Sequence, residues 1–225
     1  MNFDFLLDTN FLYTLLNGLL MTLILALIAV FIGSILGIIP AFMRLSKIKP
    51  ISFIGQAYVE IIRGTPLLVQ VLIIYSLVKL PITIVLGVDL SSFIPGMLAL
   101  TINASAYIAE LIRGGIQSVD KGQTEASLSL GLTKHQTMRY VVMPQALKNI
   151  LPSLGNEFAA LIKETSIFMY LGIAELMYAA QIVKNGTYRM MEVYIVTAVL
   201  YFTLTFTTAR LMGLVEKKMR KHDER

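Results

Sequence analysis

The 225-residue sequence contains no cysteine and no tryptophan, and its only histidines are His135 and His222. Without cysteine, the chain can form no disulfide, thiolate nucleophile or cysteine-ligated metal cluster. With so few histidines, we also expect no metal site. Charged residues are scarce at 15% of the chain, whereas 56% of the residues are apolar and the mean hydropathy is +0.72. This composition predicts an integral membrane protein rather than a soluble domain.

Several catalytic motifs are absent as well. The sequence has no G-x-x-x-x-G-K-[ST] phosphate loop, so nothing in it is expected to cradle a nucleotide. It also lacks the H-E-x-x-H pattern of zinc proteases and the G-x-S-x-G pattern of serine hydrolases. We therefore expect no catalytic residues and no cofactor bound by this chain.

Long apolar runs predict about five transmembrane helices. Between Asp8 and Arg44 no charged residue interrupts a run that exceeds the ~20 residues needed to cross hydrocarbon. The other predicted spans are 51–80, 93–112, 151–169 and 193–212. The apolar stretch 172–184 is too short to span and predicts a helix at the outer surface. The predicted fold is an all-α integral membrane protein with a single transmembrane domain over residues 1–225.

The basic residues predict the orientation of these spans. Of the 19 Lys and Arg residues, 14 lie at one set of span ends, 3 at the other set and 2 inside spans. Positively charged loops remain in the cytoplasm. The N-terminus is therefore expected outside and the C-terminus in the cytoplasm.

The cytoplasmic loop over 113–152 is longer than a turn between two spans requires. Its sequence predicts a helix over 119–130 that ends at Gly131, because glycine adopts the left-handed conformation of a helix end without steric cost. Thr133 and Gln136 have the spacing of a capping box, which predicts that a second helix begins there. A folded helix, turn and helix in a loop indicates a docking element for a partner.

A spaced motif runs through this element. Its residues are Glu125, Ala126, Ser127, Gly131, Val141, Met143 and Pro144. The motif resembles the EAA loop of the membrane subunits of binding-protein-dependent ABC importers, written as Glu-Ala-Ala, three residues, Gly, nine residues, Ile-x-Leu-Pro. Ser127, Val141 and Met143 depart from that pattern as small or apolar replacements. The stretches 59–70 and 156–167 resemble the polar amino acid branch of this family, and the resemblance extends over essentially the whole chain.

The resemblance implies a permease subunit in the cytoplasmic membrane of a prokaryote. Such a subunit translocates polar L-amino acids, of the arginine, lysine and histidine, glutamine or cystine class, by alternating access. The implied partners are a second permease copy or paralogue, two ATPase subunits that bind ATP and Mg²⁺ and receive the EAA loops, and an extracytoplasmic binding protein. The motif residues would then transmit the motion of the ATPase to the spans.

Polar residues inside the predicted spans are the candidates for a substrate pathway, because charges in hydrocarbon normally face protein or a water-filled path. Glu60 and Arg63 lie three residues apart on one helical face, and Glu157 with Glu164 belongs to a second mixed cluster. These charges either pair with one another structurally or contact substrate. Pro66 frees a backbone carbonyl that can face a cavity. The candidate pathway residues are Glu60, Arg63, Thr65, Pro66, Asn103, Ser105, Asn156, Glu157 and Glu164.

Other functions compatible with the residues alone remain open at this stage. The chain could be a membrane scaffold or sensor whose cytoplasmic loop recruits a regulatory partner without transport. An ABC exporter or channel subunit is a second alternative, and an intramembrane enzyme that uses Glu60 or Glu164 as a base is a third. The identity of the amino acid and the choice between homodimer and heterodimer are not determined by the sequence.

Overall fold

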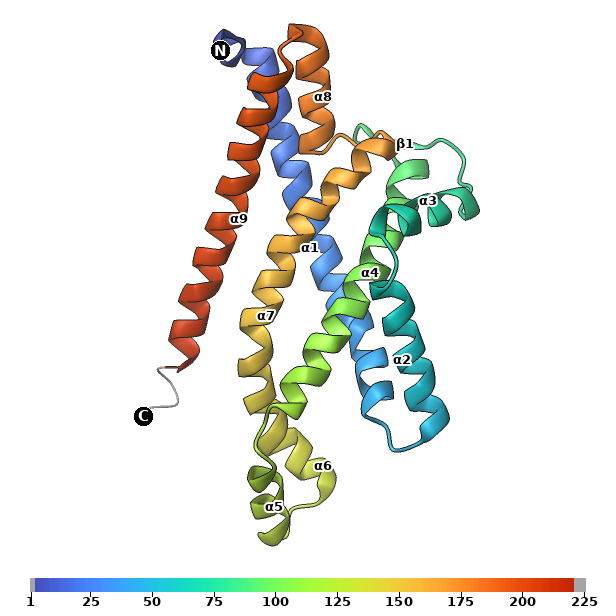
Figure 1. The fold of residues 1–225 in the computed structure, drawn as a ribbon, viewed down its shortest axis with the longest axis vertical. Helices are drawn as coiled ribbons and strands as arrows, with labels where there is room; N and C mark the ends of the chain where they lie inside the picture. The colour runs from blue at the N-terminus through green and yellow to red at the C-terminus, as the bar shows by residue number, and fades with distance from the viewer. Residues whose placement is uncertain (1–2, 221–225) are drawn as a thin grey trace.

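A computed structural model describes residues 3–220 as an elongated helical bundle (Figure 1). The helices are α1 (Thr9–Leu45), α2 (Lys49–Arg63), α3 (Leu67–Leu77), α4 (Leu90–Gln117), α5 (Lys121–Ser129), α6 (Lys134–Gln136), α7 (Met143–Glu164), α8 (Leu176–Thr187) and α9 (Met190–Arg220). A 3-10 turn precedes α1 at Asp4–Leu7, a π-helix (Thr137–Val142) joins α6 to α7, and a 3-10 helix (Thr165–Leu171) follows α7. The strands β1 (Ile84–Val85) and β2 (Val88–Asp89) form one antiparallel hairpin. The N-terminus and α8 lie at one end of the bundle, and α5 and α6 at the other.

The all-α membrane architecture is confirmed, with one of the expected spans broken. Single helices long and apolar enough to cross a bilayer are α1, α4 and α9, taken over 190–217. The expected span 51–80 is instead two helices, α2 and α3, bent by 103°. A second bent pair joins Lys134–Leu171 to α8 at 54°, and the count reaches five when each pair is taken as one span.

The fourth span also begins earlier than the expected residue 151. The chain is helical from Lys134 through the π-helix into α7, so the second half of the expected loop 113–152 belongs to the rod that enters the bundle. Pro144 does not interrupt this rod, in which it lies in the first turn of α7, directly after the π-helix. The segment between α4 and this rod is therefore short.

The closest helix packing is between α1 and α4, which cross through small residues. A Cβ on Gly33 would lie 2.8 Å from Ala104 Cβ, and one on Gly37 would lie 2.8 Å from the Ser105 carbonyl oxygen. Between helices that share an apolar solvent, such a G-x-x-x-G stripe allows the backbones to approach and gain dispersion contacts. The fully buried Leu100 lies next to this crossing in the main core, which α3 and α7 complete.

The break between α2 and α3 is closed by one side chain, that of Gln70. Pro66 has no N–H to offer to the Ile62 carbonyl one turn earlier. Gln70 Nε2 donates to that carbonyl at 2.7 Å, and it also reaches the Thr65 carbonyl at 3.1 Å and the Thr65 hydroxyl at 2.8 Å. Its Oε1 accepts from Asn103 Nδ2 at 3.0 Å, which ties the break to α4. The Ile62 and Thr65 carbonyls at the bend therefore both have a donor.

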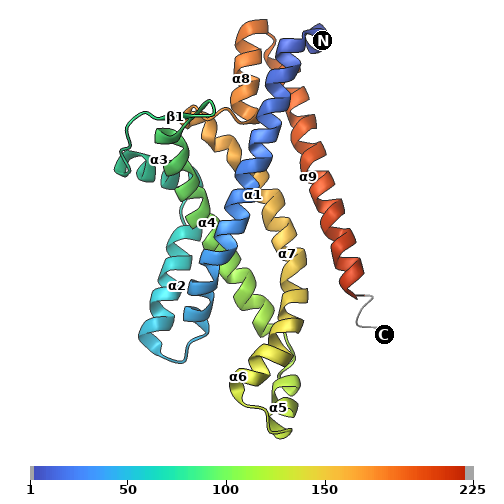
Figure 2. The same ribbon diagram turned by 180° about the vertical axis from the view of Figure 1, so that it is seen from behind.

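At the end of the bundle opposite α5 and α6, a buried carboxylate joins three helices. Glu175 caps α8 by accepting the backbone N–H groups of Met177 and Tyr178, each at 2.8 Å. The Tyr201 hydroxyl on α9 donates to the same carboxylate at 3.0 Å, and Thr22 on α1 accepts the N–H of Leu176 at 3.1 Å. The expected helix over 172–184 is present as α8, and these bonds set it against α1 and α9, as Figure 2 shows.

The hairpin between α3 and α4 ends at a capping residue. Asp89 Oδ1 accepts the Ser91 N–H at 2.9 Å and its Oδ2 accepts the Ser91 hydroxyl at 2.8 Å. The hydroxyl bond, followed by the backbone bond, holds the pKa of Asp89 below its usual range. A charged N-cap also complements the positive end of the helix dipole, so this residue defines where α4 begins.

The close α1–α4 crossing predicts the effect of a single added methyl group. Gly37→Ala is expected to lower the thermal unfolding midpoint of the purified protein, because the overlap with α4 costs about 1–3 kcal/mol and exceeds the helix propensity gained. Gly213→Ala in α9 is the matched control, since a Cβ there meets nothing within 4 Å. The control should be neutral or stabilising. Equal midpoints for the two variants would contradict the packing argument.

The role of Gln70 predicts a second effect on stability. Gln70→Leu leaves the Ile62 carbonyl and the Asn103 amide without their partners, and each buried unsatisfied group costs about 1–3 kcal/mol. Gln56→Leu is the control, because Gln56 is exposed and donates only to Glu60, at 2.7 Å. Thermal unfolding in lipid nanodiscs should show a clear loss for Gln70→Leu alone. A midpoint like that of the control would mean that Gln70 does not hold the break.

Candidate functional site

The helix, turn and helix expected in the loop is present at the tip of the bundle. Asp120 caps α5 by accepting the Gly122 N–H at 2.7 Å, and the helix ends before Gly131, whose φ is +86°. The predicted helix end at this glycine is confirmed. Both bonds of the predicted capping box are present, since Thr133 Oγ1 accepts the Gln136 N–H at 3.3 Å and Gln136 Oε1 accepts the Thr133 N–H at 2.8 Å.

The third residue of the motif, Ser127, connects α5 with the π-helix. Ser127 is buried, and its hydroxyl donates to the Thr137 hydroxyl at 3.0 Å and to the Thr124 carbonyl at 2.9 Å. An alanine at this position has no such bond to make. The departure from the family pattern therefore adds a polar tie between α5 and the π-helix.

The opposite face of α5 is open. Glu125 and Ala126 are exposed, and Leu130 at the turn is 82% exposed. Val141 and Met143 are half-buried, and Pro144 is exposed. An exposed apolar side chain beside a carboxylate on a short, rigid helix has the character of a protein docking surface.

The root of the loop is held by ion pairs that the sequence analysis did not identify. Glu110 on α4 forms salt bridges with Arg44 at the end of α1 and with Arg113 one turn further along α4. Arg113 also donates to Gln117 at 2.5 Å. The i, i+3 spacing of Glu110 and Arg113 was a usable signal, whereas the partnership with Arg44 depends on the α1–α4 crossing.

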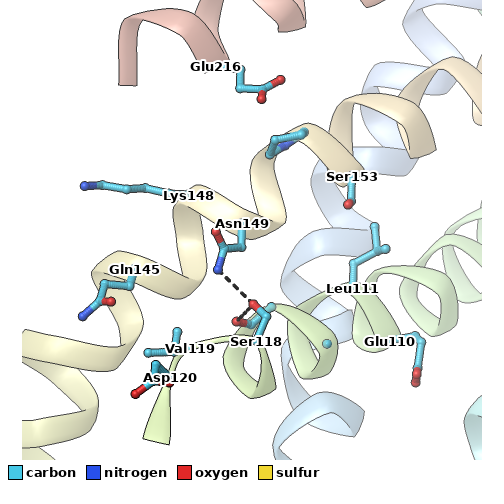
Figure 3. Close-up of a pocket in the computed structure, with 13 residues that line it drawn as sticks. Glu110, Leu111, Ser118, Val119, Asp120, Gln145, Lys148, Asn149, Ser153 and Glu216 are labelled. Atoms are coloured by element: carbon cyan, nitrogen blue, oxygen red, sulfur yellow. Dashed lines mark hydrogen bonds between the residues drawn. The ribbon is translucent and has the colours of Figure 1, made fainter. Parts of the chain in front are cut away.

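A cleft of about 1140 Å³ lies beside this root, between the ends of α4, α7 and α9 (Figure 3). Asn149 on α7 lines this cleft and donates to the Ser118 hydroxyl on α4 at 2.9 Å. Glu216 of α9 lies on the far side of the opening. The coupling loop is thus attached to the spans through α4 and the α7 rod, with α9 separated from it by this cleft.

Three of the pathway candidates come close enough to interact electrostatically. The Arg63 guanidinium lies over the Tyr107 ring, 5.0 Å from its centroid, and its charge interacts with that of Glu157. Glu157 in turn interacts with Glu164, seven residues further along the same face of α7. Among the described residues, Glu164 Oε2 is a buried oxygen without a hydrogen-bond partner. A cation, two carboxylates and an aromatic ring therefore share one region.

The depth of this region follows from helix geometry. At 1.5 Å of rise per residue, Glu157 lies about 12 Å and Glu164 about 22 Å along α7 from Asn149. Asn149 marks the loop end of the spans, since it bonds to Ser118 just after α4 ends. Glu110 on α4 is also about 12 Å from Ser118, so Glu157 lies about level with Glu110 and Glu164 about 10 Å further into the bundle.

The remaining candidates are arranged differently. Asn103 and Ser105 are buried and bonded inside the chain, to Gln70 and to the Tyr58 hydroxyl at 2.6 Å. Thr65 and Pro66 form the helix break, and Asn156 is exposed on α7. The exposed Glu60 accepts a hydrogen bond from Gln56, and within the described residues it forms no ion pair with Arg63. The structural pairing expected as one alternative for Glu60 and Arg63 is not found.

Comparison with known proteins gives concordant matches. Residues 29–221 match the family model described as binding-protein-dependent transport system inner membrane component. The chain is 40% identical to the probable glutamine ABC transporter permease GlnM of Bacillus subtilis, over 98% of this chain and 99% of that protein. It is 34% identical to the arginine transport system permease ArtQ of the same organism, over 99% and 100% of the two chains.

A solved structure matches over nearly the whole fold. The crystal structure of an amino acid ABC transporter with histidines contains a chain that is 47% identical, with a TM-score of 0.86, covering 97% of this chain and 100% of that one. The family match, the helical membrane fold and the motif at the bundle tip agree with one another. The chain therefore belongs to the inner membrane components of binding-protein-dependent transport systems, as a permease subunit of an amino acid ABC importer.

Proposed function

We propose that this permease transports polar L-amino acids by alternating access, driven through its coupling loop by a separate ATPase. The substrate belongs to the arginine, lysine and histidine, glutamine or cystine class. The single observation that carries the substrate proposal is that Arg63 and Glu157 interact electrostatically in a region where Glu164 Oε2, a buried oxygen of a half-buried residue, has no hydrogen-bond partner among the described residues. The names of the relatives, which transport glutamine and arginine, support the same class.

The chemistry of this region suits a zwitterion. A carboxylate oxygen that is buried without a donor is unfavourable by itself, and a substrate ammonium would satisfy it. Arg63 would meet the substrate carboxylate, because a guanidinium binds carboxylates with two parallel hydrogen bonds. Tyr107 beneath the guanidinium would keep its plane oriented. The same residues are exposed or half-buried, so substrate can reach them.

The exposed side chain of Glu60 indicates where a second subunit would take part in this proposal. A carboxylate that faces lipid at the depth of a span is costly. We therefore infer that the exposed face of α2 is covered by a second permease subunit, with the pathway between the two. Thr65, Pro66 and Asn156 lie along the same route, whereas Asn103 and Ser105 support its walls through their bonds to Gln70 and Tyr58.

The coupling proposal rests on how the loop is attached. The exposed face around Glu125 and Leu130 would enter a groove of the ATPase, and the Ser127–Thr137 bond would make α5 move with the π-helix. Because the helix is continuous from Lys134 to Leu171, a tilt at the loop is carried along α7 to Glu157 and Glu164. ATP and Mg²⁺ would be bound by the two ATPase subunits, and no cofactor by this chain.

The proposed function is tested by uptake of labelled amino acids into ATP-loaded proteoliposomes that hold this chain, a second permease subunit, its ATPase and its binding protein. We expect saturable accumulation of an amino acid of the proposed class that requires hydrolysable ATP. An assembled complex with active ATPase that accumulates none of the panel would contradict the substrate class. ATP-independent equilibration would contradict the mechanism.

The turn at Gly131 predicts an uncoupled variant. Gly131→Val places a β-branched residue at a φ of +86°, where it is strongly disfavoured, so α5 should lose its orientation. Uptake is expected to fall by about tenfold or more, since the strain of roughly 1–2 kcal/mol is released by unfolding the turn. Gly131→Asn is the matched control, because asparagine tolerates this conformation best after glycine.

The measurement for this pair is ATP-driven uptake together with ATPase copurification. Gly131→Val should retain membrane insertion while it loses ATPase or its stimulation, and Gly131→Asn should retain most of both. Wild-type uptake by Gly131→Val would show that the turn does not transmit motion.

The carboxylates of the pathway predict a second pair of variants. Glu157→Gln keeps the shape of the side chain but removes its charge, and a hydrogen bond to a charged group is worth about 1.5–3 kcal/mol. The KM for uptake should therefore rise by about tenfold to a hundredfold. Glu60→Gln should act in the same direction. Glu192→Gln at the start of α9 is the control, because Glu192 lies outside the cluster. If both pathway variants take up substrate with an unaltered KM, these carboxylates do not contact it.

A further inference from the structure

The connection between α3 and α4 presents an apolar surface that no other part of the chain covers. Its most exposed side chains are Leu77 at 75%, Ile82 at 80%, Ile84 at 70% and Leu86 at 99%. Between 77 and 88 the only charged residue is Lys79. Apolar exposure of this density in a short connection is unusual, since loops in contact with water are normally polar.

The tip of the hairpin carries a leucine that the backbone disfavours. The register Val85↔Val88 leaves Leu86 and Gly87 as the turn, with φ of +52° and +79°. A two-residue turn of this kind favours asparagine or aspartate before the glycine, because both residues need positive φ. A Cβ at Gly87 would meet nothing within 4 Å and Leu86 is 99% exposed, so the tip does not pack against the part of the chain that the structure describes. Contacts with the described residues therefore do not offset the strain of this leucine.

The depth of the hairpin follows from the ion pairs at the other end of α4. Arg44, Glu110 and Arg113 mark one edge of the hydrocarbon, because three charges gathered there are best placed at the interface. From Glu110 back to Leu90 is a helical rise of about 30 Å, which equals the thickness of the hydrocarbon core. Figures 1 and 2 show α4 tilted against the long axis of the bundle, which shortens its reach. The hairpin therefore lies at the second edge of the bilayer rather than beyond it.

The exposed face of the hairpin continues the outer surface of the spans. On α3, Val69, Leu72 and Ile73 are exposed, and on α4, Ile94 and Leu98 are exposed. The hairpin follows α3 directly and precedes α4 directly, and in both views it lies beside them. The hairpin thus extends the apolar outer face of α3 and α4 at the edge of the hydrocarbon. Both surfaces suit the same surroundings, which are lipid.

We propose that the 78–89 hairpin is a lipid-binding anchor that inserts Ile82 and Leu86 into the leaflet at the end of the molecule opposite to the coupling loop. The aliphatic stem of Lys79 lies among the acyl chains, and its ammonium reaches the phosphates. The anchor holds the outer end of the broken helix pair in the membrane. A docking protein that departs in each transport cycle would leave these leucine and isoleucine side chains in water, whereas the bilayer covers them continuously.

The natural absence of cysteine makes this proposal directly testable. The full importer complex is placed in nanodiscs with brominated phospholipid, and single cysteines carry an environment-sensitive fluorophore. Leu86→Cys and Ile82→Cys report on the hairpin, so a folding defect in one variant leaves the other. Phe202→Cys on α9, which is 65% exposed and within a candidate span, is the lipid control. The exposed Asn185→Cys on α8 is the water control.

The expected result is quenching by brominated lipid at Leu86 or Ile82 within about twofold of that at Phe202, and little quenching at Asn185. Access of a water-soluble quencher to both hairpin positions, as at Asn185, would overturn the proposal. Protection from both quenchers with a disulfide between two Leu86→Cys copies would assign the surface to a subunit contact instead. Protection that appears only when the binding protein is added would assign it to that partner, and either result also overturns lipid binding.

Discussion

Inside a bilayer no water is available to satisfy a backbone group that leaves its helix, and the organisation of this permease depends on how that constraint is met at Pro66. The proline removes the donor that the Ile62 carbonyl needs, and Gln70 supplies it from one turn into the next helix. Because the same amide group accepts from Asn103, the break is held against α4 rather than left free to straighten. A 103° bend is possible only with such a replacement in place.

The bend has consequences for the rest of the molecule. It turns α3 away from the direction of α2, which leaves the charged end of α2 beside α4 and brings Arg63 over Tyr107. From there Arg63 interacts with Glu157 on α7, so this polar region contains residues from three helices. The close α1–α4 crossing provides the rigid wall against which this arrangement is built. Stability and the proposed transport route thus share residues such as Gln70 and Asn103.

The loop that contains α5 and α6 is the second part of the proposed transport mechanism, and its structure explains how a short element could act at a distance. Its two ends connect to the spans in different ways. One arm returns to α4, whose last turns are held by Glu110, Arg44 and Arg113, while the other continues as an uninterrupted helix into the bundle. In the proposed mechanism, a displacement of α5 would tilt the α7 helix while the α4 side of the loop stays anchored. The half-buried carboxylates on α7 would then be the groups most sensitive to the change in their surroundings.

The features of this structure differ in how far the sequence alone predicts them. The membrane class, the long helices and the helix end at Gly131 depend on local composition and spacing, and they follow from the sequence. The Thr133–Gln136 box is equally local, since its two bonds join residues three apart. The motif spacing around Glu125 likewise indicated the family before any geometry was known. The break at Pro66 was visible as a proline, but its angle was not.

Tertiary structure decided the partners of the polar side chains. Asn103 and Ser105 had the right chemistry for a substrate site, yet the α4 packing commits them to Gln70 and Tyr58. Glu110 and Arg44 are 66 residues apart, and Glu175 and Tyr201 meet only because α8 and α9 fold back along α1. The sequence by itself determined that this chain spans a membrane and carries the EAA-like motif on a helix, turn and helix, because those properties reside in local runs and spacings. Which charges pair, which are buried and which stay available to a ligand depends on contacts between distant helices, and only the folded bundle decides them.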